Sequence, residues 1–169
     1  MIMKATWFAA LLTVLVSVDL AASPLSSEAA YESLKTLEGT WVKDDDSGKD
    51  FRIVFELTAN ESVLVESWMR GDRRHSMTVY HLDGDRLMAT HYCPQGNQPR
   101  MVSASFEQAN VVEFHYQDAT NLVDMSHSHQ HSLRLDFSAD NGTLVRGESY
   151  LGDGVEDHSE LVLVRNVHD

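Results

Sequence analysis

Apolar and polar residues alternate with a period of two along most of the chain from Trp41 onward. Successive side chains of a β-strand point to opposite faces, so this period predicts strands that bury one face. Ten strands are expected, one around Trp41 and the others at 51–58, 62–70, 75–82, 86–92, 100–107, 111–116, 127–138, 143–151 and 156–167. Most connections are short and contain Gly, Asp or Asn, which predicts that neighbouring strands run antiparallel.

A helical pattern precedes the strands. Residues 26–37 carry apolar side chains at helical spacing, with Ser26 or Ser27 as the N-cap and Gly39 after the end. A sheet of ten short antiparallel strands has two exposed edges unless it closes on itself. The sequence therefore predicts an all-β protein, an antiparallel up-and-down β-barrel of about ten strands with a short N-terminal helix. A two-sheet sandwich is the alternative, but it usually needs longer crossings between sheets.

The first 22 residues have the pattern of a secretory signal peptide. Lys4 supplies the positive charge, residues 7–18 form an apolar stretch too short to span a bilayer, and Ala22 ends a tolerable cleavage site. This divides the chain into a signal peptide (1–22), a helical segment (23–38) and a barrel (39–169). We expect a secreted or periplasmic protein cleaved near Ala22, with no membrane-spanning segment after cleavage. An uncleaved membrane anchor is the alternative.

Composition narrows the classes of partner. The chain has 13 basic and 26 acidic residues and a formal charge of −13, which disfavours binding to nucleic acid. One cysteine, Cys93, permits neither an intrachain disulfide nor a multi-cysteine zinc site. Nine histidines are many beside 13 Lys and Arg residues, which makes them candidates for a functional role.

Three histidines in the segment 127–138 are spaced two residues apart. His127, His129 and His131 share strand parity with Leu133, which predicts that they continue the inward face. His91 has compatible parity on another strand, so His91, His129 and His131 are candidate ligands for Zn²⁺, Cu²⁺ or Fe²⁺ with an open position. The alternatives are a hydrogen-bonded polar lining, a solvated strand end, or a haem site.

The connection from Cys93 to Arg100 is the second chemical feature. It is rich in Pro and Gly, and it offers Asn97 and Arg100 as fixed polar groups, the latter able to clamp a carboxylate or phosphate. The alternative is a long hairpin that satisfies its own backbone. Cys93 is either a reactive thiol beside His91 or, as is more usual for a free cysteine, simply buried.

Two short motifs carry a resemblance to known proteins. Gly39-Thr40-Trp41 resembles the Gly-x-Trp signature of calycins, which include lipocalins, fatty-acid-binding proteins and nitrobindin-like barrels. The resemblance implies that Arg165, near the end of the last strand, packs over Trp41. The block from Thr90 to Met101 is similar to a motif of uncharacterised bacterial secreted proteins, which implies no established activity.

The leading hypothesis is an exported barrel that encloses a small, partly apolar ligand. Its candidate polar contacts are His91, Asn97, Arg100, His115, His127, His129 and His131. A metal-dependent or haem-dependent enzyme that uses the same histidines is the first alternative. The second is an envelope protein with a packed barrel whose loops bind a partner. Neither the ligand nor the oligomeric state follows from the sequence.

Overall fold

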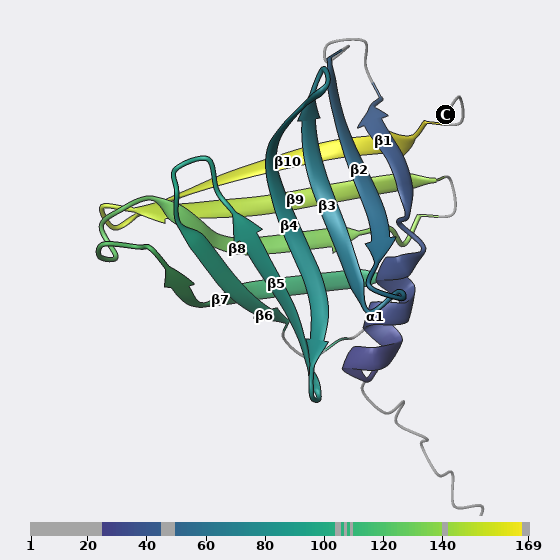
Figure 1. Ribbon diagram of the computed structural model, residues 1–169, viewed down its shortest axis with the longest axis horizontal. Helices are drawn as coiled ribbons and strands as arrows, with labels where there is room; N and C mark the ends of the chain where they lie inside the picture. The colour runs from purple at the N-terminus through teal and green to yellow at the C-terminus, as the bar shows by residue number, and fades with distance from the viewer. Residues whose placement is uncertain are drawn as a thin grey trace, which may run out of the picture.

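The computed structural model describes residues 25–44, 50–103, 106, 108, 110–139 and 142–166. These residues form one closed antiparallel barrel of ten strands in the order β1-β10-β9-β8-β7-β6-β5-β4-β3-β2, with a single helix at one end (Figure 1). The predicted fold class is therefore confirmed. The predicted signal peptide, 1–22, lies outside the described residues. Within them, no helix is both long enough and apolar enough to cross a bilayer.

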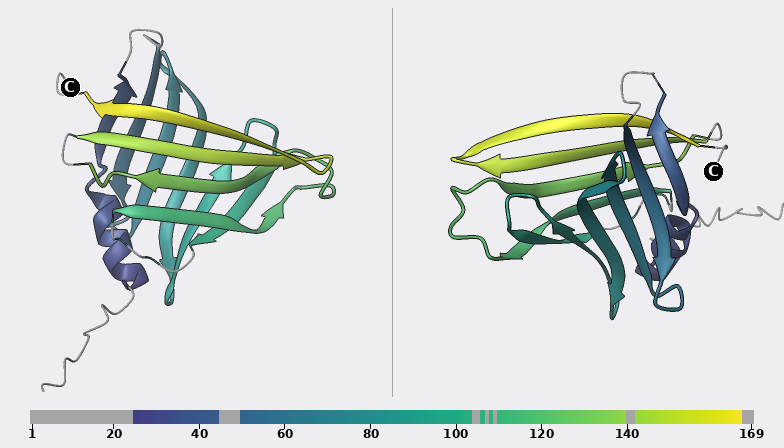
Figure 2. Two further views of the ribbon diagram at one scale, coloured as in Figure 1. Left: turned by 180° about the vertical axis from the view of Figure 1, so that it is seen from behind. Right: turned by 45° about the horizontal axis from the view of Figure 1, so that its top comes forward.

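The helix is α1 (Ser27–Lys35), and the strands follow it in the chain. Their bounds are β1 Gly39–Lys43, β2 Phe51–Thr58, β3 Val63–Arg70, β4 Arg73–Asp83, β5 Arg86–Tyr92, β6 Gln98–Ser103, β7 Val111–Thr120, β8 His129–Asp136, β9 Thr143–Gly152 and β10 Val155–Arg165. Strands β7–β10 cross β1–β4 steeply, so the barrel is flattened into two crossing walls (Figures 1 and 2).

Helix α1 covers one end of the barrel. Ser26 caps it by accepting a hydrogen bond from the Ala29 amide, 3.2 Å away, and its buried face packs on the core. Ser27 Oγ donates to the Asp85 carbonyl in the β4–β5 connection, and Tyr31 Oη donates to the Glu61 carbonyl in the β2–β3 connection. The connections β5–β6, β7–β8 and β9–β10 lie at the opposite end (Figure 2).

The join between α1 and β1 has the geometry that the calycin resemblance implied. The Arg165 guanidinium lies 4.6 Å from the centre of the Trp41 ring, and its Nη2 donates to the Thr36 carbonyl at the end of α1. Gly39 has a φ of +124°, and a Cβ atom there would lie 2.8 Å from Arg165 Nη1. Only glycine fits both the backbone angle and this close approach. Arg165 thus fastens the helix to the last strand.

Apolar side chains fill the half of the interior beneath α1. They come from the helix and from most strands, and they include Leu34, Leu37, Ile53, Phe55, Leu64, Leu87, Phe114, Leu133, Leu135, Leu144 and Leu163, each at most 1% exposed. Burial of each such side chain contributes on the order of 1.5–3 kcal/mol relative to exposure. This apolar half is the main source of stability.

Two details of β7 and β8 differ from the expected strands. β7 continues to Thr120, through part of what the sequence predicted to be a connection. β8 begins at His129, so His127 precedes the strand, and the pairing with β9 shifts between Gln130 and Ser132. This β-bulge inserts one extra residue into β8. The inward and outward positions predicted by alternation from Leu133 are therefore exchanged for the residues that precede the bulge. Gln130, rather than His129, takes the inward position there.

Candidate ligand-binding site

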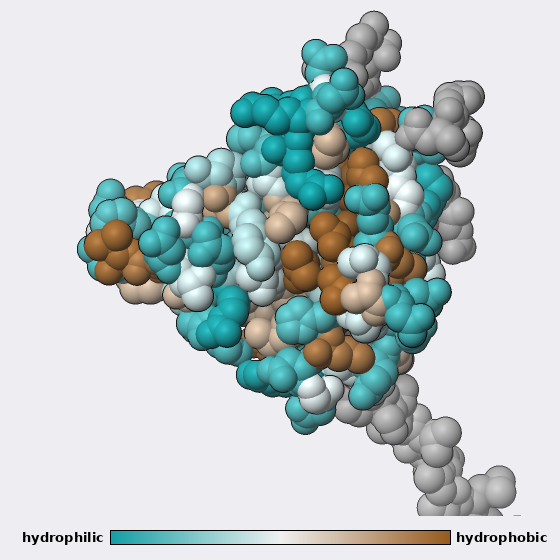
Figure 3. Space-filling view, in the orientation of Figure 1, coloured by the Kyte–Doolittle hydropathy of each residue, from teal (hydrophilic) through white to brown (hydrophobic). Residues whose placement is uncertain are grey.

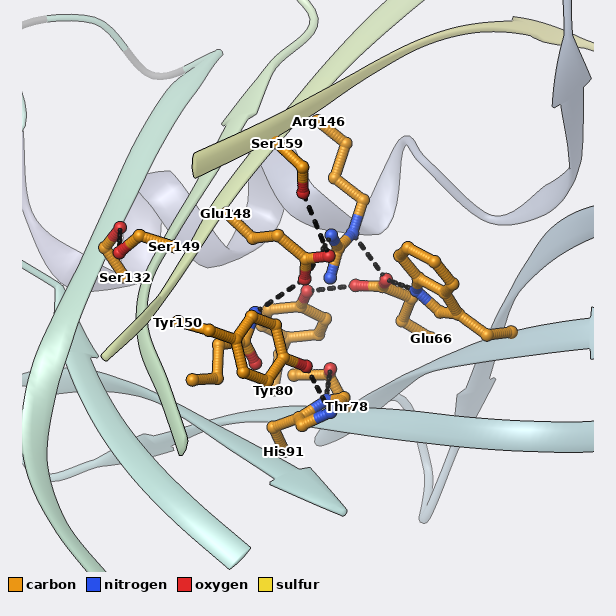
Figure 4. A network of polar contacts seen from close by, with 12 residues as sticks. Glu66, Thr78, Tyr80, His91, Ser132, Arg146, Glu148, Ser149, Tyr150 and Ser159 are labelled. Carbon is orange, nitrogen blue, oxygen red and sulfur yellow. Dashed lines mark hydrogen bonds and ion pairs between the residues drawn. The ribbon is translucent and has the colours of Figure 1, made fainter. Parts of the chain in front are cut away.

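The half of the barrel interior opposite α1 is polar. Its central residues are joined by hydrogen bonds, and we refer to them as the interior cluster: Glu66, Trp68, Tyr80, Gln130, Arg146 and Glu148. Figure 4 shows Glu66, Tyr80, Arg146 and Glu148 side by side. Arg146 and Glu66 form its centre, with side chains that are 0% exposed and with Arg146 Nε 2.7 Å from Glu66 Oε1. Two ionised groups are thus fully buried in a barrel whose other half is apolar, which is costly unless each charge is compensated.

Three donors surround the Glu66 carboxylate. Besides Arg146, Trp68 donates its indole N–H to Glu66 Oε1 at 2.6 Å, and Tyr80 donates its hydroxyl to Glu66 Oε2. Burial, reinforced by the charge of Glu66, raises the pKa of Tyr80 well above its ordinary value, so the hydroxyl stays a donor. The Arg146 guanidinium also lies 4.6 Å from the centre of the Trp68 ring. Glu66 is therefore well compensated.

The Glu148 carboxylate is the more open member of the interior cluster, with its side chain 13% exposed. Its Oε2 accepts from Arg146 Nη1 at 2.9 Å and from Gln130 Nε2 at 3.0 Å. Arg146 Nη2 and Gln130 Oε1 have no hydrogen-bond partner among the described residues, although both atoms are buried. The interior cluster thus retains one unused donor and one unused acceptor.

His91 lies beside the interior cluster in a short chain of hydrogen bonds. Its Nδ1 is 3.0 Å from Thr78 Oγ1, and its Nε2 is 3.3 Å from the Tyr150 hydroxyl (Figure 4). Burial, followed by the charge of Arg146, lowers the pKa of His91 from 6.5 to about 4. The imidazole is therefore neutral at neutral pH and both donates and accepts in this chain.

Cys93 adjoins the same chain. Its side chain is buried, and it interacts with the Tyr150 hydroxyl. Burial raises the pKa of the Cys93 thiol, so the thiolate that a reactive cysteine needs is disfavoured. Of the two interpretations of Cys93, the structure favours the buried, unreactive thiol.

A cavity of about 190 Å³ lies above the interior cluster, on the side away from α1. It is lined by Trp68, Arg70, His75, Ser76, His91, Pro94, Glu148 and Tyr150. At about 30 Å³ for each water in the liquid, its volume equals that of about six water molecules or one small organic molecule. Its walls combine two aromatic rings with a carboxylate, a guanidinium and two imidazoles, so it suits a polar ligand rather than a hydrocarbon chain.

The loop 93–97 is fixed beside this cavity by hydrogen bonds to other loops. Asn97 is buried, and its Nδ2 donates to the Ser128 carbonyl at 3.0 Å, while its Oδ1 has no partner among the described residues. Asn121 Nδ2 donates to the Gly96 carbonyl at 2.7 Å. The two long connections of the sequence thus meet at one end of the barrel. Asn97 thus ties the loop 93–97 to the β7–β8 connection beside the cavity.

Arg100 lies on the outer wall instead. Its guanidinium makes a two-bond ion pair with the Asp118 carboxylate at 2.5 Å, and both side chains are more than 40% exposed. The pair lowers the pKa of Asp118, chiefly through the hydrogen bond from Arg100. Because Asp118 already neutralises it and it does not line the cavity, Arg100 is not positioned to clamp a ligand there.

The remaining predicted histidines lie apart from the cavity. His127 is exposed and pairs with Asp124, whereas His129 and His131 pack around Tyr116. His115 lines a separate groove on the outer face of β7–β10. The described residues contain no group of three or more His, Cys, Asp or Glu side chains that could hold a metal. The predicted set of His91, His129 and His131 therefore does not come together, and only His91 lines the cavity.

Sequence reasoning missed the interior cluster, although its signal was present. Glu66 shares strand parity with Leu64, and both Arg146 and Glu148 share parity with Leu144. Charged residues at inward positions of a strand are rare unless they are paired. Charged residues at inward positions of several strands therefore indicate the interior cluster, whereas of the three histidines predicted to bind a metal only His91 adjoins it.

No protein-family model matches the chain, and no curated protein matches it. Function is therefore inferred from the geometry of the site itself.

Proposed function

We propose that the protein is an exported, calycin-like barrel that binds one small polar molecule in the cavity opposite α1. The observation that carries this proposal is the pairing of a fully buried ion cluster with an adjoining cavity. Buried ion pairs are often no better for stability than apolar residues of equal volume, so their presence needs a reason other than folding. Recognition of a polar ligand supplies that reason. The partly apolar ligand first expected is replaced by a polar one, because apolar side chains of the barrel already fill the other half.

The charges around the cavity indicate the ligand's chemistry. Within the interior cluster, two carboxylates outnumber one guanidinium, and neutral His91 adds no positive charge. Arg70, on another part of the cavity wall, makes no ion pair among the described residues and restores the balance. A ligand with a protonated amine near Glu148 and an anionic group near Arg70 matches this separation of charge. The expected ligand class is a small zwitterion.

Three probes with the same four-carbon chain test this assignment. We expect 4-aminobutyrate, which carries both charges, to bind more tightly than butylamine or butyrate. Each of the latter lacks one charge–charge contact, and a loss of about 1.4 kcal/mol weakens binding about tenfold. Isothermal titration calorimetry or amide chemical shifts of the purified protein would measure this. Equal affinity for all three probes would contradict the zwitterion assignment.

A matched pair of variants locates the site. His75 lines the cavity and His115 lines the outer groove, and both residues are exposed strand residues. His75→Trp should fill the mouth and abolish probe binding, whereas His115→Trp should leave it unchanged. The reverse result would move the binding site to the outer groove. If a broad set of small polar molecules bound equally to the protein and to His75→Trp, the cavity would have no binding function.

A further inference from the structure

A second group of unused polar atoms lies where β7 and β8 diverge, outside the cavity. The rings of His129 and His131 are 5.9 Å apart, and both contact Tyr116, at 4.8 and 5.7 Å between ring centres. The Tyr116 hydroxyl contacts the Met125 sulfur at 3.7 Å. Two imidazoles and one thioether therefore gather around a single tyrosine, and we refer to these four residues as the tyrosine cluster.

The tautomer of His129 follows from its partner. Its Nδ1 is 2.8 Å from the His127 carbonyl oxygen, which can only accept, so Nδ1 carries the hydrogen. Nε2 then holds a lone pair, yet it is buried and has no partner among the described residues. A metal-bound histidine is held in the same way, with one ring nitrogen donating to a carbonyl and the other directed at the ion.

His131 also has a buried ring nitrogen, Nδ1, that makes no hydrogen bond to the described residues. An unsatisfied buried polar atom costs about 1–3 kcal/mol, so two in adjacent rings form a substantial penalty. Coordination of one ion by both nitrogens would remove it.

The turn that carries Met125 is firmly held. The Asp124 carboxylate accepts from the Ser126 amide at 2.8 Å and from the Ser126 hydroxyl at 2.5 Å. The Asp153 amide donates to the Ser126 carbonyl at 2.9 Å. A Cβ atom on Gly152, the last residue of β9, would lie 3.1 Å from Ser128 Cα, so the β7–β8 connection packs closely on the end of β9. The backbone on either side of Met125 is thus held in place.

The geometry points to a Cu(I) site formed by His129 Nε2, His131 Nδ1 and the Met125 sulfur. Imidazole suits several transition metals, but a thioether ligand selects the soft ion Cu(I). Met125 is 49% exposed, which leaves a route for the ion from solvent. Val123, in the β7–β8 connection, and Val155, the first residue of β10, are exposed apolar residues of the same end of the barrel, and Figure 3 shows apolar surface at one tip of the molecule. None of these residues lines the cavity, so this inference is independent of the proposed function.

Competition with the chromogenic chelator bicinchoninate, under reducing and anaerobic conditions, tests the site. All measurements use a Cys93→Ser background, because a free thiol would itself bind Cu(I). We expect one equivalent of Cu(I) per chain. Loss of a group that only orients a metal ligand typically costs about ten- to hundredfold in affinity. His129→Gln and His131→Gln remove ligands and should each weaken binding by about a hundredfold or more, and Met125→Leu, which removes the weaker thioether ligand, by about tenfold. Because Met125 is largely exposed, Met125→Leu is expected to fold normally.

The controls use residues of the same kinds outside the tyrosine cluster. His158→Gln on β10 and Met69→Leu on β3 should leave Cu(I) affinity unchanged. His127→Gln should weaken Cu(I) binding far less than His129→Gln, because the exposed His127 ring contacts Asp124 and the carbonyl that holds His129 is kept. X-ray absorption should detect a sulfur ligand that Met125→Leu removes.

Three results would overturn the assignment. The first is the absence of stoichiometric Cu(I) binding. The second is a loss in His127→Gln as large as that in His129→Gln, which would indicate an exposed histidine segment rather than the buried pair. The third is tighter binding of Zn²⁺ than of Cu(I) with no effect of Met125→Leu, which would exclude the thioether.

Discussion

The two halves of the barrel are built from the same strands and differ in what those strands bury. On β3, Leu64 belongs to the apolar half, and Glu66, two residues on, belongs to the interior cluster. On β9, Leu144 and Arg146 make the same change, and on β5, Ala89 is followed by His91. On the neighbouring strands, Phe55 pairs with Glu66 and Leu135 pairs with Arg146, so β2 and β8 stay apolar where β3 and β9 become charged. Alternation therefore decides which face a residue occupies, whereas the strand and the position along it decide whether that residue joins the apolar half or the interior cluster.

The halves also differ in how they stabilise the fold. Apolar burial stabilises without direction, at about 25 cal/mol for each Å² removed from water. Buried ions contribute little unless every partner is present, because each is costly to desolvate. The apolar half beneath α1 should therefore tolerate loss of volume in a graded way, whereas the interior cluster should respond to the loss of a single partner.

The largest effect is expected for Arg146→Met. It leaves the Glu66 and Glu148 carboxylates buried without their guanidinium, at a cost of about 3–5 kcal/mol of unfolding free energy. Urea unfolding followed by circular dichroism would measure this. Adding Glu66→Gln and Glu148→Gln should recover most of the loss, since no charge then remains unpaired.

Leu34→Ala in the apolar half is the matched comparison. It should cost about 2–5 kcal/mol through a cavity that no change of charge repairs. If the triple variant of the interior cluster were no more stable than Arg146→Met alone, unpaired charge would not be the source of the loss.

An intermediate effect is expected from pH. The unfolded chain protonates His91 near 6.5, whereas the folded protein does so only near 4. Between these pH values the unfolded state binds a proton at His91 that the folded state does not bind. The stability that neutral His91 contributes is therefore fully present above pH 6.5 and is lost as the pH falls to 4. The loss amounts to up to about 3 kcal/mol, at about 1.4 kcal/mol per unit of pKa difference.

Unfolding curves between pH 4 and 7, measured for the unmodified protein and for His91→Gln, would isolate the contribution of His91 to stability. All other titrating groups are the same in the two proteins, so their effects cancel in the difference. His91→Gln should flatten the dependence, whereas Leu34→Ala should lower stability equally at each pH. An unchanged slope in His91→Gln would mean that His91 takes up its proton in the folded state.

The smallest effect is expected for Arg100→Gln. Its ion pair with Asp118 is exposed to solvent, and such pairs contribute about 0.2–1 kcal/mol. Ligand binding in the cavity should be unaffected. A change in probe affinity comparable to that of His75→Trp would show that the outer wall at Arg100 takes part in recognition after all.

The sequence predicted the barrel well because alternation and turn chemistry are local. Gly39, Trp41 and Arg165 were recognised through the calycin resemblance, and the structure has the ring–guanidinium contact that it implied. The cavity could not be found in this way, because it depends on which inward side chains from β3, β4, β5 and β9 meet at one depth. The parity of the histidines was misassigned because nothing in the sequence marks the bulge between Gln130 and Ser132.

That bulge has an evolutionary consequence. Strand β8 accommodates His131 as a supernumerary residue while Gln130 and Leu133 keep their inward places on either side. Deletion of this one codon would leave the alternation of every other β8 side chain intact and remove one of the two candidate copper-binding rings. Related barrels can therefore gain or lose this imidazole in a single mutational step, independently of the interior that it borders.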